Sequence, residues 1–269
     1  MNKKLLKRKK RAMTPEQARR VRQSGHDDAK EFAFLIGLPS DYQNNPQAKK
    51  DVVDLCGDTH SVKSGEKKWQ IFLYSPSRFE NDPIFKRLNG LGELLTKCLD
   101  VFPNSDEYKR DKKRYKNLLR VPMMELKDRL QNKDTLRAFL EKSFFNAGEV
   151  TYLTIKNGNS FHIFHANDVI NILTNNIKVE NSLGELKVVF KVVNTNSKTC
   201  KRFPLVTIGE IEMRNDSEVH FKEVKFWMNK DKTFDLLAAN VIPKKNAKPR
   251  LFVYGKALKT FRKYNVGQG

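Results

Sequence analysis

The segment 49–69 constrains the fold more than any other part of the chain, because apolar and polar residues alternate in it around a turn signal. A Gly-Asp pair at 57–58 separates two short runs of this pattern, which is typical of a β-hairpin. We therefore expect one strand over residues 51–55 and a second strand over residues 60–63.

Asp51 and Lys63 would lie at the same end of this hairpin. A carboxylate can hold a divalent metal ion, and a nearby lysine can orient or help to deprotonate the water that attacks a phosphodiester. In this interpretation Asp51 is the metal anchor, Lys63 is the catalytic lysine, and Val62 offers its carbonyl oxygen to the metal or its side chain to the core. Asp54 competes with Asp51, but it would face the opposite side of the strand. The rival interpretation is an ordinary exposed hairpin.

The charge of the chain favours a polyanionic partner. Lysine and arginine number 52 against 31 aspartate and glutamate residues, a formal net charge of +21. An enzyme of small metabolites rarely needs such an excess, whereas phosphates attract these side chains and released counterions add affinity. The alternative is that the charge only keeps the protein soluble.

The composition also argues against secreted and membrane classes. Cys56, Cys98 and Cys200 are far apart and odd in number, so they form no disulfide framework, and no Cys/His spacing indicates zinc. The N-terminus lacks the apolar region of a signal peptide, and no apolar run approaches the roughly 18 residues of a membrane span. We expect an intracellular, cytoplasmic protein without a membrane segment.

Periodicity and turn signals predict an α/β core followed by a β-rich C-terminal part. Thr14 and Pro15 indicate a helix start, Asn157-Gly158 indicates a second hairpin, and residues 69–74 fit either a strand or a helix. The other expected elements are helices over 14–35 (broken near 24–25), 84–102, 106–143 (two helices separated near Val121-Pro122) and 166–173, strands over 150–155, 161–164, 186–193, 205–213 and 219–228, and a basic loop over 244–250.

The first hairpin resembles the active-site hairpin of PD-(D/E)XK nucleases, with Asp51 in the first acidic position and Ser61-Val62-Lys63 in the second half. The match departs from the family twice. Lys50 stands where the family often has proline, and Ser61 stands where aspartate or glutamate is usual. A subset of type II restriction endonucleases has such a Ser-x-Lys version, in which a following helix supplies the missing carboxylate.

This resemblance implies the remaining site residues. Glu80 is the first candidate for the second metal-binding acid, Glu66 is another, and Gln70 could also reach the site. Many members carry a glutamate on the preceding helix, which Glu31 matches here. The resemblance is most specific over residues 31–80. Over residues 28–230 it is only a general similarity of sequence.

The resemblance also implies the architecture and the partners. It implies a restriction-endonuclease-like core, with a mixed central sheet flanked by helices, and Mg²⁺ as the cofactor. We divide the chain into a basic N-terminal arm (1–13), a nuclease core (14–180) and a β-rich DNA-recognition region (181–269). Double-stranded DNA would be the substrate, and a homodimer would match a palindromic site.

The C-terminal strands carry a second constellation, in which Asp216 precedes Glu223-x-Lys225 and forms an alternative active-site pattern. We favour DNA contact for this region, since arginine pairs with guanine, asparagine pairs with adenine, and a β-ribbon fits the major groove. A solvated strand face is the competing interpretation. The expected DNA-binding residues are Arg214, Asn215, Ser217, His220, Lys222, Lys225, Lys244 and Lys245.

The sequence therefore predicts a Mg²⁺-dependent, site-specific DNA endonuclease of the type II restriction class, as found in restriction-modification systems. One alternative is a repair or recombination nuclease of the same fold. Another is a non-catalytic nucleic-acid-binding protein with a degenerate nuclease core, an idea motivated by Ser61. We interpret His162 and His165 as structural residues of a sheet.

Overall fold

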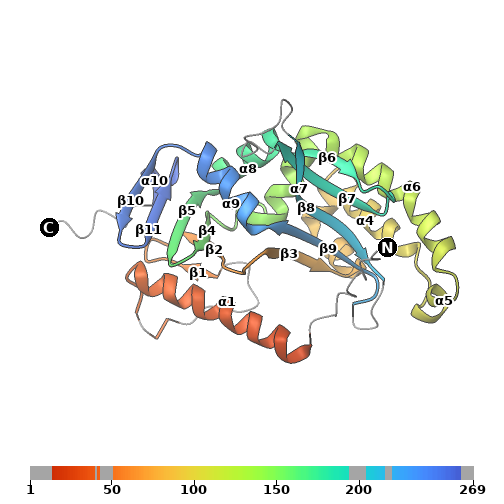
Figure 1. The fold of residues 1–269 in the computed structure, drawn as a ribbon, viewed down its shortest axis with the longest axis horizontal. Helices are drawn as coiled ribbons and strands as arrows, with labels where there is room; N and C mark the ends of the chain where they lie inside the picture. Colours follow the sequence, from red (N-terminus) through yellow and green to blue (C-terminus); the bar gives the residue numbers. More distant parts are fainter. Residues whose placement is uncertain (1–13, 40, 43–50, 194–203, 216–219, 262–269) are drawn as a thin grey trace, which may run out of the picture.

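The computed structural model describes residues 14–39, 41–42, 51–193, 204–215 and 220–261. Over these ranges the chain is an α/β protein with two β-sheets and helices packed against them (Figure 1). One sheet is mixed and the other is antiparallel. The expectation of an α/β chain with a mixed sheet flanked by helices is confirmed.

The mixed sheet has six strands in the order β1-β2-β4-β5-β11-β10. The pairs β2–β4 and β5–β11 are parallel, and the other neighbours are antiparallel. Both predicted hairpins belong to this sheet, as the pairs β1–β2 and β4–β5. The strand bounds are β1 Val52–Val53, β2 Thr59–Lys63, β4 Tyr152–Asn157, β5 Ser160–His165, β10 Lys244–Lys248 and β11 Leu251–Tyr254.

The antiparallel sheet has five strands in the order β3-β9-β8-β7-β6. Residues 69–74, which fitted a strand or a helix, are a strand. Each sheet combines strands from both sides of residue 181, so the expected division there does not coincide with the boundary between the sheets. The bounds are β3 Lys68–Tyr74, β6 Lys178–Asn181, β7 Lys187–Val193, β8 Leu205–Arg214 and β9 Glu223–Asn229.

The helices begin largely where capping residues indicate. Thr14 and Gln17 form a capping box at the start of α1, and Asn132 accepts backbone hydrogen bonds at the start of α7. The helix bounds are α1 Pro15–Leu35, α2 Pro76–Asn81, α3 Pro83–Arg87, α4 Leu91–Asp100, α5 Ser105–Arg110, α6 Lys112–Gln131, α7 Lys133–Phe145, α8 Ala166–Asn176, α9 Lys230–Asn240 and α10 Ala257–Thr260.

The expected strand over 51–55 is only β1, because the hairpin turn begins at Asp54. Three expectations about helix boundaries are also wrong. Helix α1 runs without a break through Gly25. Helix α6 continues through Pro122, and the break between the two long helices falls at the Asn132 cap instead. Pro122 is buried among the residues that pack α6 onto the core, and this packing outweighs the lost backbone bond. The expected helix over 84–102 is two helices, because Asn89 and Gly90 both adopt a positive φ.

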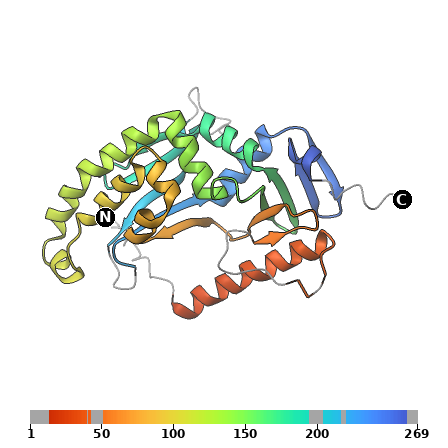
Figure 2. The ribbon, with the colours of Figure 1, turned by 180° about the vertical axis from the view of Figure 1, so that it is seen from behind.

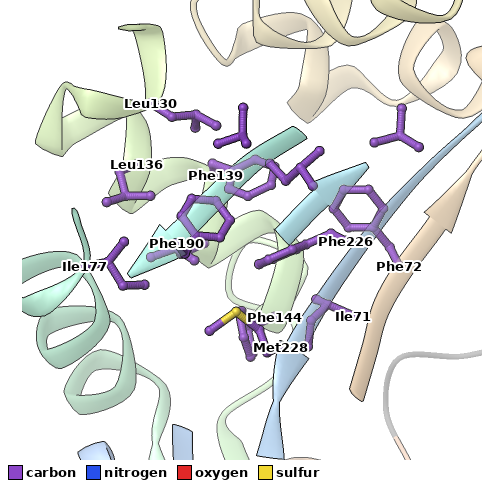
Figure 3. Close-up of a cluster of buried hydrophobic side chains, with 14 of the residues drawn as sticks. Ile71, Phe72, Leu130, Leu136, Phe139, Phe144, Ile177, Phe190, Phe226 and Met228 are labelled. Atoms are coloured by element: carbon purple, nitrogen blue, oxygen red, sulfur yellow. The ribbon is translucent and has the colours of Figure 1, made fainter. Parts of the chain in front are cut away.

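Two apolar clusters hold these layers together. In the larger one, helices α6 and α7 cover a face of the antiparallel sheet, and Phe226 packs against Phe72, Phe139 and Phe190 with ring centroids 5.3–5.6 Å apart (Figure 3). The smaller cluster joins α1 to the mixed sheet and includes Phe32, which is fully buried. Figure 1 shows α1 running alongside this sheet. These clusters fix the first hairpin beneath α1.

Candidate active site

The first hairpin places Asp51 beside Ser61 of β2, the strand that carries Lys63 two residues further on. Val52 pairs with His60, which places Asp51 opposite Ser61 at the end of the ladder. The Asp51 carboxylate accepts hydrogen bonds from the Val62 N–H at 2.7 Å and from the Ser61 hydroxyl at 3.4 Å. Side chains alternate along a strand, so Ser61 and Lys63 project from the same face of β2. The acid is therefore fixed beside the face that carries the lysine.

The Asp51 carboxylate and the Lys63 ammonium both have atoms available to bind a ligand. Lys63 is half-buried, and its side chain forms no ion pair or hydrogen bond with any residue that the structure describes. Only one oxygen of Asp51, Oδ2, accepts hydrogen bonds from described residues, which leaves Oδ1 available. The Val62 side chain lies in the smaller apolar cluster, so its backbone N–H, rather than its side chain, shapes this site.

Asp54 stabilises the hairpin turn instead. Its Oδ1 accepts hydrogen bonds from the backbone N–H groups of Cys56 at 2.7 Å and Asp58 at 3.1 Å. Its Oδ2 lies 3.9 Å from Nε2 of His60, and both side chains are buried. These contacts close the hairpin turn, so the arrangement favours Asp51 over Asp54 as the acid of the site.

Glu31 of α1 lies on the other side of the mixed sheet. Its Oε2 accepts a hydrogen bond from Nζ of Lys156 at 2.6 Å, and its Oε1 pairs with Arg250. Lys156 follows Ile155, the neighbour of Lys63 in the parallel pair, so it projects from the face opposite to Lys63. The structure thus does not bring Glu31 to the Asp51 site.

The Glu31 pairs hold α1 on the sheet. Burial alone would raise the pKa of Glu31, but the hydrogen bonds and charges of Lys156 and Arg250 outweigh it and lower that pKa. Lys156 also pairs with Asp28 at 2.6 Å. Neither cation was predicted as a partner of Glu31, because they lie 125 and 219 residues from it in the sequence. No local sequence signal connects positions so far apart.

Glu80 is remote from the first hairpin. It is exposed on α2, and it lines a hollow of about 550 Å³ together with residues of α2, α3 and α4, none of them from β1 or β2. The seven residues of β3 separate this helix from β2, and an extended strand of that length spans about 20 Å. Glu66 and Gln70 are exposed and lie much closer along the chain to Lys63.

The hairpin offers few carboxylates to a Mg²⁺ ion. Among the described residues, no group of three or more histidine, cysteine or acidic side chains could hold a metal. Mg²⁺ in proteins is commonly bound through one or two carboxylates, with water and substrate phosphate completing the shell. Asp51 with its available Oδ1 meets this minimal requirement once a phosphodiester is present.

The expected DNA-binding residues fall into two separate groups. Arg214 ends β8 and Asn215 follows it, whereas Lys244 and Lys245 lie on the exposed edge strand β10. The end of β8 and strand β10 lie at opposite ends of the molecule (Figures 1 and 2). They therefore do not form one compact surface. The expected basic loop over 244–250 is mostly strand β10, which is a correction.

The second acidic constellation is partly engaged elsewhere. Glu223 accepts a hydrogen bond from Nδ1 of His220 at 2.8 Å, and Lys225 lies 3.5 Å from Glu212. Lys222 adopts a positive φ of 56° in the approach to β9. The other two expected residues of this region, Asp216 and Ser217, lie outside the described residues.

His162 and His165 have structural partners, as the sequence analysis expected. Nδ1 of His162 lies 2.9 Å from the hydroxyl of Tyr254, and burial, followed by the charge of Lys244, lowers the pKa of His162 to about 4. Nδ1 of His165 accepts the N–H of Asn167 at the start of α8, and burial lowers its pKa as well.

Searches against protein-family models, curated proteins and solved structures found no significant match. Within the ranges that the structure describes, no helix is long and apolar enough to cross a membrane. The geometry of the site is therefore the main basis for a functional proposal.

Proposed function

We propose that this protein is a Mg²⁺-dependent endonuclease that cuts double-stranded DNA at specific sites, on a restriction-endonuclease-like core. The observation that carries the proposal is that one hairpin presents both a fixed carboxylate, Asp51, and a lysine, Lys63, whose side chain is not engaged by any of the described residues. The net charge of +21 supports a polyanionic substrate.

Each residue of the hairpin is proposed to have a separate role in the reaction. Mg²⁺, when bound, would polarise a phosphoryl oxygen and lower the pKa of an attacking water. Oδ1 of Asp51 would hold the ion, while the Val62 N–H and the Ser61 hydroxyl keep the carboxylate in place through Oδ2. The Lys63 ammonium would orient the water and offset negative charge that develops at phosphorus. The resemblance to PD-(D/E)XK nucleases implies 5′-phosphate and 3′-hydroxyl products.

We propose that the supporting group beside Asp51 comes from the connection that leads into β3 or from β3 itself. Glu66 and Gln70 are exposed and lie a few residues beyond Lys63, whereas Glu80 belongs to the α2–α4 hollow. The substitutions Glu66→Gln, Gln70→Ala and Glu80→Gln separate these candidates by their cleavage rates. We expect the first two to slow cleavage more than the third.

Sequence readout is proposed for the end of β8. Arg214 and Asn215 have side chains suited to guanine and adenine, and β8 and β9 form an antiparallel ribbon there. Lys244 and Lys245 on β10 would contact phosphates at the other end of the molecule. A two-fold dimer would match a palindromic site.

A non-catalytic DNA-binding protein is the second candidate. It is favoured by Ser61 in the usual acidic position and by the absence of a metal-binding cluster among the described residues. The two candidates differ in one measurement, the incubation of plasmid and phage DNA with the protein and either Mg²⁺ or EDTA. Discrete fragments that require Mg²⁺ support the nuclease, and discrete sites argue against a repair nuclease. DNA that is bound but never cut supports the second candidate.

A further inference from the structure

A basic hollow of about 530 Å³ lies far from the first hairpin, between helices α5 and α6, the start of β7 and the end of β8. Both views place α5 and the start of α6 at the end of the molecule away from β1 and β2 (Figures 1 and 2). Its volume is within the range of about 300–1,000 Å³ that is usual for small-ligand sites. Its cationic side chains are Lys109, Lys112, Lys116, Lys187 and Arg214.

Among the described residues that line this hollow, Glu212 is the one carboxylate, and it is already ion-paired. Its oxygens lie 2.7 Å from Nζ of Lys187 and 3.5 Å from Nζ of Lys225. Burial alone would raise the pKa of Glu212, but these two lysines outweigh it and lower that pKa, so the group stays ionised and paired. Lys187 also pairs with Glu210 at 3.1 Å, so the positive charge that remains to the hollow comes mainly from Lys112 and Lys116.

Lys112 and Lys116 supply charge that is not used within the protein. They lie one helical turn apart on α6 and are exposed. Neither forms an ion pair or a hydrogen bond with a residue in the described ranges. Two adjacent ammonium groups at the rim of a cavity form a suitable site for a phosphate.

Three of the residues that line the hollow are aliphatic or thioether side chains. Leu119 and Met213 are buried in the larger apolar cluster, and Leu186 is partly buried beside them. The amide of Asn215 adds hydrogen-bond donors and an acceptor at the edge. A ligand that matches all three features has a phosphate, a flat ring with apolar faces, and polar atoms on the edge of that ring.

We propose that this hollow binds a nucleoside phosphate, with the phosphate on Lys112 and Lys116 and the base against Leu119 and Met213. The nucleotide is either free or part of a DNA strand that extends beyond the cleavage site. Only the DNA source rests on the proposed nuclease function. In both cases the site is separate from Asp51 and Lys63.

The test uses the full chain and isothermal titration with dAMP, deoxyadenosine and inorganic phosphate, followed by a short DNA duplex and a short single strand. The test variant is Lys112→Gln/Lys116→Gln. The control variant, Lys113→Gln/Arg120→Gln, removes the same charge from exposed positions of the same helix outside the hollow. Circular dichroism melting checks that both variants fold.

The proposal expects dAMP to bind more tightly than deoxyadenosine or phosphate alone, and the test variant to lose at least about tenfold in affinity. The control variant should stay within about threefold of the parent protein. A loss with dAMP indicates a free nucleotide, and a loss confined to DNA indicates a nucleotide within a strand. Equal affinity of the parent, test and control proteins for every probe overturns the proposal.

The outcome is distinguishable from a failure of the nuclease proposal. A test variant that cuts DNA at the same discrete sites but binds it more weakly supports both proposals. A parent protein that binds dAMP but never cuts DNA refutes the nuclease and leaves the nucleotide site standing. Phosphate binding as tight as dAMP binding overturns the assignment of a base to Leu119 and Met213.

Discussion

A buried ion pair between Asp82 and Lys142 gives the most quantitative prediction for the stability of this fold. Nζ of Lys142 lies 2.7 Å from Oδ2 of Asp82, and their side chains are only 4% and 8% exposed. Lys142 also donates to Asn146 at 2.7 Å, and Asp82 accepts the N–H of Ile84 at 3.0 Å. The pair therefore connects the start of α3 to the end of α7 within the core.

The substitution Lys142→Met leaves the Asp82 carboxylate buried without its counter-charge. Removing one partner of a buried pair typically costs about 3–5 kcal/mol. Because Asp82 keeps its hydrogen bond from Ile84, we expect the lower end, about 3 kcal/mol in the free energy of unfolding. The double variant Asp82→Asn/Lys142→Met should recover most of this loss, since it buries no unpaired charge.

Urea unfolding at neutral and acidic pH tests this reasoning. Burial alone would raise the pKa of Asp82, but the hydrogen bond from Lys142 and the Ile84 N–H outweigh it and lower that pKa. A lowered carboxyl pKa contributes stability above the unfolded pKa of about 3.9, and this contribution is lost as the pH falls through the folded pKa. In the Asp82→Asn protein, the free energy of unfolding should therefore decline less steeply below about pH 4. A cost below about 1 kcal/mol for Lys142→Met refutes the reasoning.

Three further outcomes follow from individual contacts. Asp54→Ala should lower the free energy of unfolding by about 1–3 kcal/mol, measured in urea, because two turn N–H groups lose their acceptor. The ring of His162 should titrate near pH 4 by NMR, since burial and Lys244 lower its pKa to about 4. Because the unfolded histidine titrates near pH 6.5, His162 should reduce stability progressively as the pH falls from about 6.5 to 4, and His162→Gln should remove that slope. Glu31→Gln should keep cleavage within about tenfold of the parent rate while costing about 1 kcal/mol of stability, because Glu31 pairs with Lys156 away from Lys63.

The parts of the fold that follow from local signals could be predicted from the sequence. Both hairpins have alternating strands around a recognisable turn, and the structure contains both. The position of Asp51 opposite Ser61 follows from the same hairpin. Within one hairpin, a few residues determine which side chains meet.

The errors arise where distant packing decides the local structure. Proline at position 122 would be expected to break a helix, yet burial against the core keeps α6 continuous. The basic segment of β10 reads as a loop, but it pairs with β11 as an edge strand, where exposed lysines are common. The link between Glu31 and Arg250 spans 219 residues, so no local pattern could indicate it.

The most direct test of the proposed site is single-turnover cleavage of plasmid DNA in Mg²⁺ by the Lys63→Met protein. Lys67→Met is the matched control, because Lys67 is exposed in the connection that follows the same strand. We predict that Lys63→Met lowers the cleavage rate at least about a hundredfold while DNA affinity and thermal stability match those of Lys67→Met. Equal cleavage rates for the two variants would contradict the assignment of the active site to the first hairpin.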